Sequence, residues 1–259
     1  MNPIIPDWPA PSCVRAFSTV RSGGLSGMPY HGHQKSAGGL NLGMHVGDDA
    51  HIVCENRALL RRFLPSEPVW LNQVHGNRVV DASRSGDAPD ADASFACCPD
   101  VVCVIMTADC LPVLLCRRDG KAVAAAHAGW RGLAAGVLEN TVRAISEKKG
   151  ADIMAWLGPA IGPDAFEVGE DVREAFLQKD RHLSVAFEKR TGADGKYLAD
   201  IYALARLTLR QAGVMQVYGG GFCTVSDESR FYSYRRDGVT GRMATGIWID
   251  KSADSGEKC

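Results

Sequence analysis

Three side chains suited to a soft divalent metal stand at the ends of short apolar segments. His75 follows LNQV, Cys110 ends TADC, and His127 follows AVAAA. Two imidazoles and one thiolate form a ligand set that suits zinc, and three protein ligands leave a fourth position open for water or substrate. An open position is typical of a catalytic metal, so this pattern predicts a metal-dependent enzyme.

Other interpretations of the same residues stay open. Cys110 with His75 or His127 could form a nucleophile and its base, and zinc would compete with this mechanism for the same sulfur. Each residue could also be structural, as a hydrogen-bonded histidine or a buried thiol. Asp109 could orient a metal ligand or move a proton, or it could cap backbone amides in a turn.

The glycine turn GWRG, at residues 129–132, predicts an anion site. It opens an apolar helical repeat, so the first helical amides are unpaired and Arg131 supplies a fixed positive charge. Phosphate or carboxylate would fit, whereas the alternative is tight packing at the glycines beside a solvated arginine. The glycine loops at residues 21–26 and 38–43 are more typical of turns than of anion-binding loops. The HGH of His31 and His33 is more typical of a solvated loop than of a metal site.

The hydrophobic pattern predicts the elements that position these residues. The runs VVCVIM, PVLLCR and AVAAA are too continuous for amphipathic strands and indicate a sheet covered on both faces. A helix should follow the glycine turn, because residues 133–145 repeat apolar side chains at helical spacing. We also expect strands at DIMAWLG and VMQVYGG, and helices near residues 170–177 and 198–212.

The two ends of the chain carry further patterns. Residues 49–64 predict a helix capped by Asp48 or Asp49, and residues 69–76 predict a strand that delivers His75 to its end. A second short strand is expected at NRVVDA. Near the C-terminus, RFYSYRR and RMATGIWI flank DGVTG, which predicts a hairpin and favours a mixed sheet over a doubly wound one.

Composition excludes several classes of protein. The 259 residues are 46% hydrophobic and 23% charged, which is typical of a folded domain. With 29 Lys and Arg against 30 Asp and Glu, the net charge of -1 provides no basic field for nucleic acid or an anionic membrane. Without a leader pattern or an apolar run of roughly 20 residues, we expect a cytoplasmic protein whose cysteines are mostly reduced and buried.

Ten short motifs occur in a fixed order along nearly the whole chain: RSGGLS, LNLGMHVGDD, ENR, LNQVHG, DADA, TADCLPVLL, AHAGWRGL, LGPAIGP, FEVG and SYRRDGVTGRMA. Together they resemble the YfiH family, also called the multicopper polyphenol oxidase or laccase-like family and, more recently, purine nucleoside phosphorylases. The resemblance implies an α+β (mixed α/β) fold with two mixed sheets sandwiched between helices, similar to that of bacterial deamidating toxins. We expect one catalytic domain over residues 1–250 and a disordered tail over 251–259.

The resemblance also implies a catalytic zinc site at His75, Cys110 and His127, with copper as the other possible metal. It implies phosphorolysis of adenosine, inosine and S-methyl-5′-thioadenosine to the free base and ribose 1-phosphate, with adenosine deamination as a second activity. The expected partners are therefore a purine nucleoside and phosphate, and neither a nucleic acid nor a membrane.

The remaining roles in this mechanism fall to four residues. Substrate contacts are implied near Arg21 and Asn41. We assign Asp109 to proton transfer, and Arg131 or Arg21 to the anion. The chain departs from the family pattern in a longer loop, rich in His and Gly, at residues 27–39, and in lacking the cysteine that many relatives carry after GPxIG.

Three alternative functions are kept. One is a hydrolase that edits peptidoglycan precursors by removing a wrongly attached serine. Another is a copper-dependent polyphenol oxidase, but seven histidines do not provide both a blue-copper site and a trinuclear cluster. The third is a binding module without enzymatic activity, which retention of every activity by Cys110→Ala would support.

Overall fold

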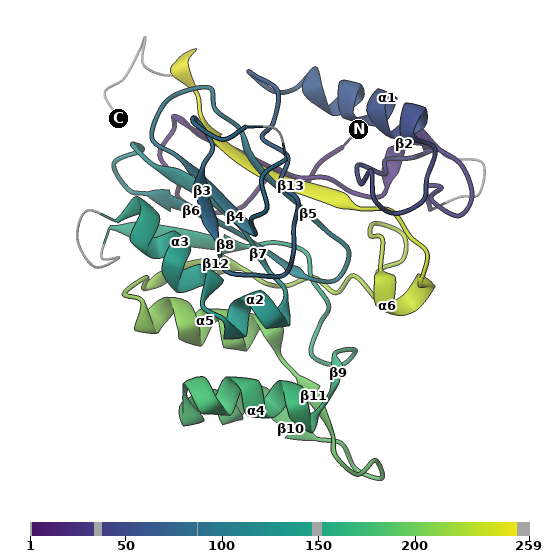
Figure 1. The fold of residues 1–259 in the computed structure, drawn as a ribbon, viewed down its shortest axis with the longest axis vertical. Helices are drawn as coiled ribbons and strands as arrows, with labels where there is room; N and C mark the ends of the chain where they lie inside the picture. Colours follow the sequence, from purple (N-terminus) through teal and green to yellow (C-terminus); the bar gives the residue numbers. More distant parts are fainter. Residues whose placement is uncertain (1, 34–37, 87, 147–151, 253–259) are drawn as a thin grey trace.

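The computed structural model describes residues 2–33, 38–86, 88–146 and 152–252 (Figure 1). Its helices are α1 (Ala50–Arg61), α2 (Trp130–Ala134), α3 (Val137–Ile145), α4 (Glu170–Lys179), α5 (Ile201–Gln211) and α6 (Tyr234–Asp237), with a 3₁₀ helix η1 (Arg181–Ala186). Its strands are β1 (Val14–Ser18), β2 (Ser22–Ser26), β3 (Val79–Asp81), β4 (Ala93–Ala96), β5 (Cys103–Thr107), β6 (Leu111–Arg117), β7 (Val123–Ala128), β8 (Ile153–Leu157), β9 (Glu167–Gly169), β10 (Phe187–Lys189), β11 (Lys196–Ala199), β12 (Gln216–Gly219) and β13 (Met243–Ile249).

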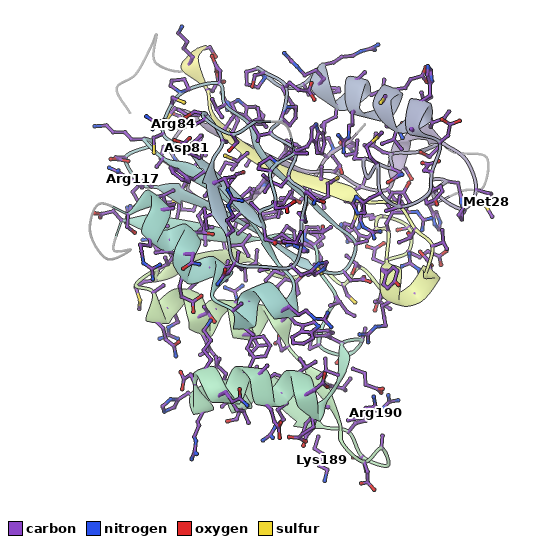
Figure 2. All side chains as sticks on the ribbon, viewed as in Figure 1. Met28, Asp81, Arg84, Arg117, Lys189 and Arg190 are labelled. Atoms are coloured by element: carbon purple, nitrogen blue, oxygen red, sulfur yellow. The ribbon has the colours of Figure 1, made fainter. Side chains whose placement is uncertain are left out.

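Two sheets form the body of the molecule. The larger is six-stranded and mixed, in the order β12-β8-β6-β7-β4-β3, with parallel pairing of β12 to β8 and of β3 to β4. The smaller is antiparallel, in the order β1-β13-β5. A third, short sheet, β10-β11-β9, lies beside α4. Lys189 at the end of β10 and the next residue, Arg190, project away from the two main sheets (Figure 2).

The core is divided into layers by the larger sheet. Along β6, Val113 and Leu115 pack in the cluster that contains α3 and α5, whereas Leu114 and Cys116 pack against the smaller sheet. The outer face of the smaller sheet meets α1 through Leu60. Both faces of β6 are therefore buried, which explains its unbroken apolar sequence.

This layering confirms the predicted α+β (mixed α/β) fold with two sheets between helices (Figure 1). The larger sheet is mixed, as expected, and the smaller is antiparallel throughout. The predicted helix at residues 49–64 is α1, where the side chain of Asp49 accepts a hydrogen bond from His51 N. No helix in the described part of the chain is long and apolar enough to span a bilayer.

Three local predictions are wrong. The C-terminal hairpin is absent from the described residues, because β13 pairs with β1 and β5 and the segment before it contains α6, capped by Ser233. Residues 69–76 make isolated bridges at Val69 and Asn72 and no strand ladder. The helix expected after residue 132 is divided into α2 and α3 at Gly136, whose φ of 94° favours glycine. The predicted tail lies, from residue 253 onward, outside the described residues.

Candidate metal and active site

His75, Cys110 and His127 come together from three separate segments. Their ligand atoms all lie within 4.8 Å of one another, and Cys110 Sγ is 3.9 Å from His75 Nε2. The two imidazole rings meet edge to face with centroids 4.8 Å apart. We call these three residues the His-Cys-His group. It is the one group of three or more potential metal ligands within the residues that the structure describes.

The backbone places the group at one end of the β6–β7 pair. Pro112 pairs with His127 in this antiparallel ladder, and Cys110 stands directly before β6. His75 and Asp109 both have positive φ angles, 60° and 88°, which are uncommon for residues other than glycine. Such conformations persist where surrounding contacts enforce them. Here they occur in the two turns that bring His75 and Cys110 together.

The carboxylate of Asp92 accepts hydrogen bonds from both histidines of the group. Its Oδ1 accepts hydrogen bonds from His127 Nδ1 at 2.8 Å and from His75 N at 2.9 Å, and its Oδ2 accepts one from Gly76 N at 2.6 Å. Because an ionised carboxylate only accepts, Nδ1 of His127 carries a proton in either charge state of the ring, and Nε2 is the atom that can bind a metal once it is deprotonated. Asp92 is fully buried. Sequence reasoning assigned it no function, although the DADA motif contains it.

The group is electrically polarised. Burial raises the pKa of the Cys110 thiol, but the charge and hydrogen bond of His127, followed by those of His75, outweigh burial and lower the pKa to about 6. Burial lowers the pKa of His127, whereas Cys110 and Asp92 raise it to about 9. A thiolate near neutral pH is the form of cysteine that binds a metal.

The absence of a side chain at Gly129 leaves space for the side chains of Cys110 and His75. A Cβ at this position would lie 3.0 Å from Cys110 Sγ and 3.2 Å from His75 Cδ2. The glycine is the N-cap of α2, whose five residues form too short a helix to provide a strong dipole. The turn GWRG therefore acts mainly by allowing the close approach of backbone and ligands.

Asp109 is buried beside Cys110 with both carboxylate oxygens occupied. Thr224 Oγ1 donates to Oδ1 at 2.6 Å, and the backbone N–H of Arg235 donates to Oδ2 at 2.6 Å. These bonds join the turn before β6 to the segment around α6. They favour the interpretation of Asp109 as a residue that fixes the turn over that of a proton carrier.

The predicted substrate residues all have contacts within the protein. Arg131 is exposed and covers the ring of Trp130 at 4.4 Å. Arg21 is buried, where its guanidinium donates to two backbone carbonyls and lies over the ring of Tyr232. Asn41 is fully buried and accepts a hydrogen bond from the backbone N–H of Arg242. Arg21 and Asn41 thus hold loops together by these contacts.

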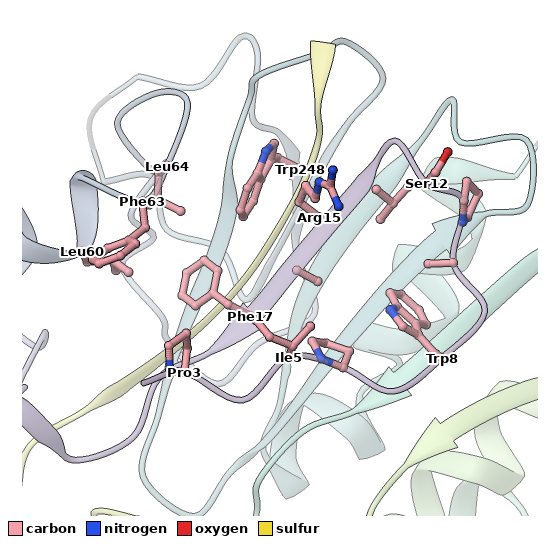
Figure 3. A pocket seen from close by; sticks show the side chains of 15 residues that line it. Pro3, Ile5, Trp8, Ser12, Arg15, Phe17, Leu60, Phe63, Leu64 and Trp248 are labelled. Carbon is pink, nitrogen blue, oxygen red and sulfur yellow. The ribbon is translucent and has the colours of Figure 1, made fainter. Parts of the chain in front are cut away.

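Other sequence candidates do not add to the site. The HGH histidines, His31 and His33, belong to no metal-binding group among the described residues. A cavity of about 420 Å³ between the N-terminal segment, α1 and the smaller sheet is lined by aromatic and aliphatic side chains (Figure 3). Its single titratable residue, Arg15, is paired with Asp250. The His-Cys-His group is therefore a better candidate for chemistry than this apolar cavity.

Comparisons with known proteins agree with this fold. The model of the family described as "Multi-copper polyphenol oxidoreductase laccase" matches residues 15–250. The chain is 53% identical to purine nucleoside phosphorylase PA4543 of Pseudomonas aeruginosa over 246 residues, covering 95% of this chain and 98% of the relative. It is also 53% identical to purine nucleoside phosphorylase YfiH of Escherichia coli K12, with the same coverage, over 249 residues.

Solved structures extend the comparison. Protein NMB0706 of Neisseria meningitidis is 51% identical and superposes with a TM-score of 0.88, covering 96% of this chain and all of that one. YlmD of Geobacillus stearothermophilus is 30% identical, with a TM-score of 0.81 and 94% of both chains covered. The chain therefore belongs to the YfiH family, the family of the polyphenol oxidoreductase laccase model.

Proposed function

We propose that this protein is a zinc-dependent purine nucleoside phosphorylase. The observation that carries the proposal is the convergence of His75, Cys110 and His127 within 4.8 Å of one another. Relatives named purine nucleoside phosphorylase, aligned over 95% of this chain, support the reaction class.

The donor atoms fit a metal ion. One thiolate and two imidazoles suit tetrahedral zinc with an open fourth position, and the carboxylate of Asp92 behind His127 is the outer partner expected of a metal-bound histidine. Blue-copper sites also use two histidines and a cysteine, so metal analysis is part of the test below. A zinc ion bound here would supply a Lewis acid beside the nucleoside.

The protein's own residues hold this arrangement in place. Asp92 orients the imidazole of His127 and holds the backbone of His75. Asp109 fixes the turn that carries Cys110, and Gly129 leaves space above the sulfur. In the proposed reaction a phosphate oxygen bonds to C1′ of the ribose while the C1′–N9 bond breaks. The electron pair of the broken C1′–N9 bond passes to the purine, and the purine takes up a proton. Ribose 1-phosphate is then released.

We further propose adenosine, inosine and S-methyl-5′-thioadenosine as substrates, and hydrolytic deamination of adenosine as a second activity. In deamination, water attacks C6 of the purine ring and ammonia leaves. This reaction is compatible with the same site, because His- and Cys-bound zinc is the means by which known nucleobase deaminases activate water.

One experiment separates these activities. Metal-analysed protein is incubated with adenosine, with and without phosphate, and adenine, ribose 1-phosphate and inosine are measured separately. Adenine that forms together with ribose 1-phosphate only when phosphate is present supports phosphorolysis, and inosine in either condition supports deamination. If the wild type forms none of these products, or Cys110→Ala forms them at the wild-type rate, the proposal is wrong.

A further inference from the structure

Arg242 lies near the turn that carries Cys110, although it is distant from that turn in sequence. It directly precedes Met243, which pairs with Thr107 in the antiparallel β13–β5 ladder. Continued by one residue, the same register places Arg242 across from the turn that contains Asp109 and Cys110. Burial lowers the pKa of Arg242, whereas the charges of Cys110 and Asp109 raise it, which agrees with this proximity.

A second arginine approaches from α1. Arg57 Nε donates a hydrogen bond to Leu42 O at 3.0 Å, and its guanidinium lies over the ring of Trp70 at 3.9 Å. Its Nη2 is 3.8 Å from Met106 Sδ, at the end of β5 that leads to Cys110. Arg57 is half-buried, so its charge is held by packing on the side of the molecule where the metal ligands meet.

The loop at residues 42–46 lies between the two arginines. Leu42 N donates to Arg242 O at 3.1 Å, and the side chain of Arg242 covers Gly43, where a Cβ would lie 2.7 Å from its Cγ. His45 is on the same loop, and its pKa is lowered first by burial and then by the charges of Arg242 and Arg57. Three potentially cationic side chains therefore share one small region.

Neither guanidinium forms an ion pair with a carboxylate of the described residues. Arg242 donates through Nη1 to the carbonyl oxygens of Thr240 and Gly241, each at 3.1 Å. Within the described ranges, its Nε and Nη2 form no hydrogen bond. Arg57 likewise has a carbonyl and a sulfur as its polar contacts there.

The nearby acidic side chains already have hydrogen-bond donors within the protein. Asp109 accepts from Thr224 Oγ1 and Arg235 N, and the side chain of Asp48 accepts from Ser26 Oγ and Asn41 Nδ2. Glu67, whose charge raises the pKa of Arg57, contacts Arg61 and Trp70. Both guanidinium groups are therefore half-buried near a proposed metal centre without a direct ion pair among the described residues. Such a region attracts an anion. A guanidinium group binds phosphate by donating two parallel hydrogen bonds to its oxygens.

We infer that Arg242 and Arg57 form the phosphate subsite of this protein, with free donors of Arg242 as the principal contact. The inference rests on the proposed phosphorylase function and specifies where its second substrate binds. It replaces Arg131 and Arg21 in that role, since Arg131 is exposed over Trp130 and the guanidinium of Arg21 bonds to carbonyls. Phosphate held here would lie near the turn that carries Cys110.

The test uses the metal-loaded full chain and inorganic phosphate. Initial rates are measured at saturating adenosine while phosphate is varied, for wild type, Arg242→Gln, Arg242→Lys, Arg57→Gln, Arg131→Gln and the control Arg143→Gln on α3. Loss of a charge-assisted contact in Arg242→Gln should raise the KM for phosphate about tenfold or more. Arg242→Lys should recover part of that loss, and the KM for adenosine and the zinc content should stay near wild type.

A second readout separates this inference from the proposed function. Binding of inorganic phosphate is followed by calorimetry without nucleoside, in the same variants. Phosphate binding that weakens in Arg242→Gln supports the subsite even if no phosphorolysis is detected in any variant. An unchanged KM and unchanged binding in both Arg242→Gln and Arg57→Gln, or a rise confined to Arg131→Gln, overturns the subsite while leaving the phosphorylase proposal intact.

Discussion

The two ends of the β6–β7 pair give the same residue type opposite chemistry. At one end Cys116 pairs with Val123 in the ladder and is fully buried, and burial raises the pKa of its thiol to about 12. At the other end, Cys110 stands just before β6, where His127 and His75 outweigh burial and lower the pKa to about 6. The interior of the sheet therefore keeps a thiol inert. The end of the β6–β7 pair that carries Cys110, His75 and His127, which we call the polar rim, activates one.

The most severe test of this comparison removes each sulfur in turn. Cys110→Ala should lose the metal and reduce the rate of phosphorolysis by more than about 100-fold. Loss of a residue that only supports a ligand costs up to about 100-fold, and loss of a ligand itself should cost more. Cys116→Ala should keep both and lose about 1 kcal/mol of unfolding free energy through a small cavity. Metal analysis, initial rates and urea denaturation measure the three quantities. Equal metal content in the two variants would remove the distinction between rim and interior.

Thiol reactivity compares the same residues without mutation. In chelator-treated protein, alkylation of Cys110 by iodoacetamide should rise as pH increases through about 6, because its pKa is lowered and the thiolate is the nucleophile. Cys116, with a pKa of about 12, should react at least about 100-fold more slowly at pH 7. Peptide mass mapping after timed quenching gives both rates. A Cys110 profile centred near pH 9 would contradict the polarised rim.

A substitution at Asp92 tests whether the rim depends on its buried carboxylate. Asp92→Asn should weaken metal binding about 10–100-fold, because the orienting partner of His127 loses its charge. Competition with a chromogenic chelator gives the affinity. Asp90→Asn is the matched control, since Asp90 belongs to the same DADA motif but is exposed and accepts from Asn72. An equal affinity in the two variants would show that Asp92 has no special role.

The smallest expected effect concerns space at the rim. Gly129→Ala should weaken metal binding about fivefold, because its Cβ would crowd Cys110 and His75 while the backbone at φ −60° accepts alanine. Gly27→Ala, where no atom lies within 4 Å of the added Cβ, should leave the affinity unchanged. The same chelator competition applies, and stronger binding in Gly129→Ala would mean that the group has room to spare.

The sequence allowed much of the rim to be predicted. His127 and Cys110 stand where unbroken apolar runs end or turn, so a polar side chain there must lie at a sheet boundary. Asp92 escaped prediction because its function depends on the pairing of β4 with β7, which brings it opposite His127 across 35 positions. No local pattern in DADA indicates that pairing.

Nonlocal pairing also explains the C-terminal error. RFYSYRR and RMATGIWI flank the glycine-bearing turn DGVTG, a pattern that is typical of a hairpin. β13 instead pairs with β1, where Val14 lies opposite Ile249, and Gly246 allows close contact with Phe17. Arg242 was likewise visible only as part of a motif, because its position beside Cys110 follows from the pairing of β13 with β5.

X-ray absorption at the metal edge tests the central claim most directly, on wild-type protein and on Cys110→Ala. Wild-type protein should show a zinc shell with one sulfur at about 2.3 Å and two imidazole nitrogens at about 2.0 Å, whereas Cys110→Ala, which should lose the metal, should show no such shell. A wild-type shell without sulfur, or an unchanged spectrum in Cys110→Ala, would contradict it.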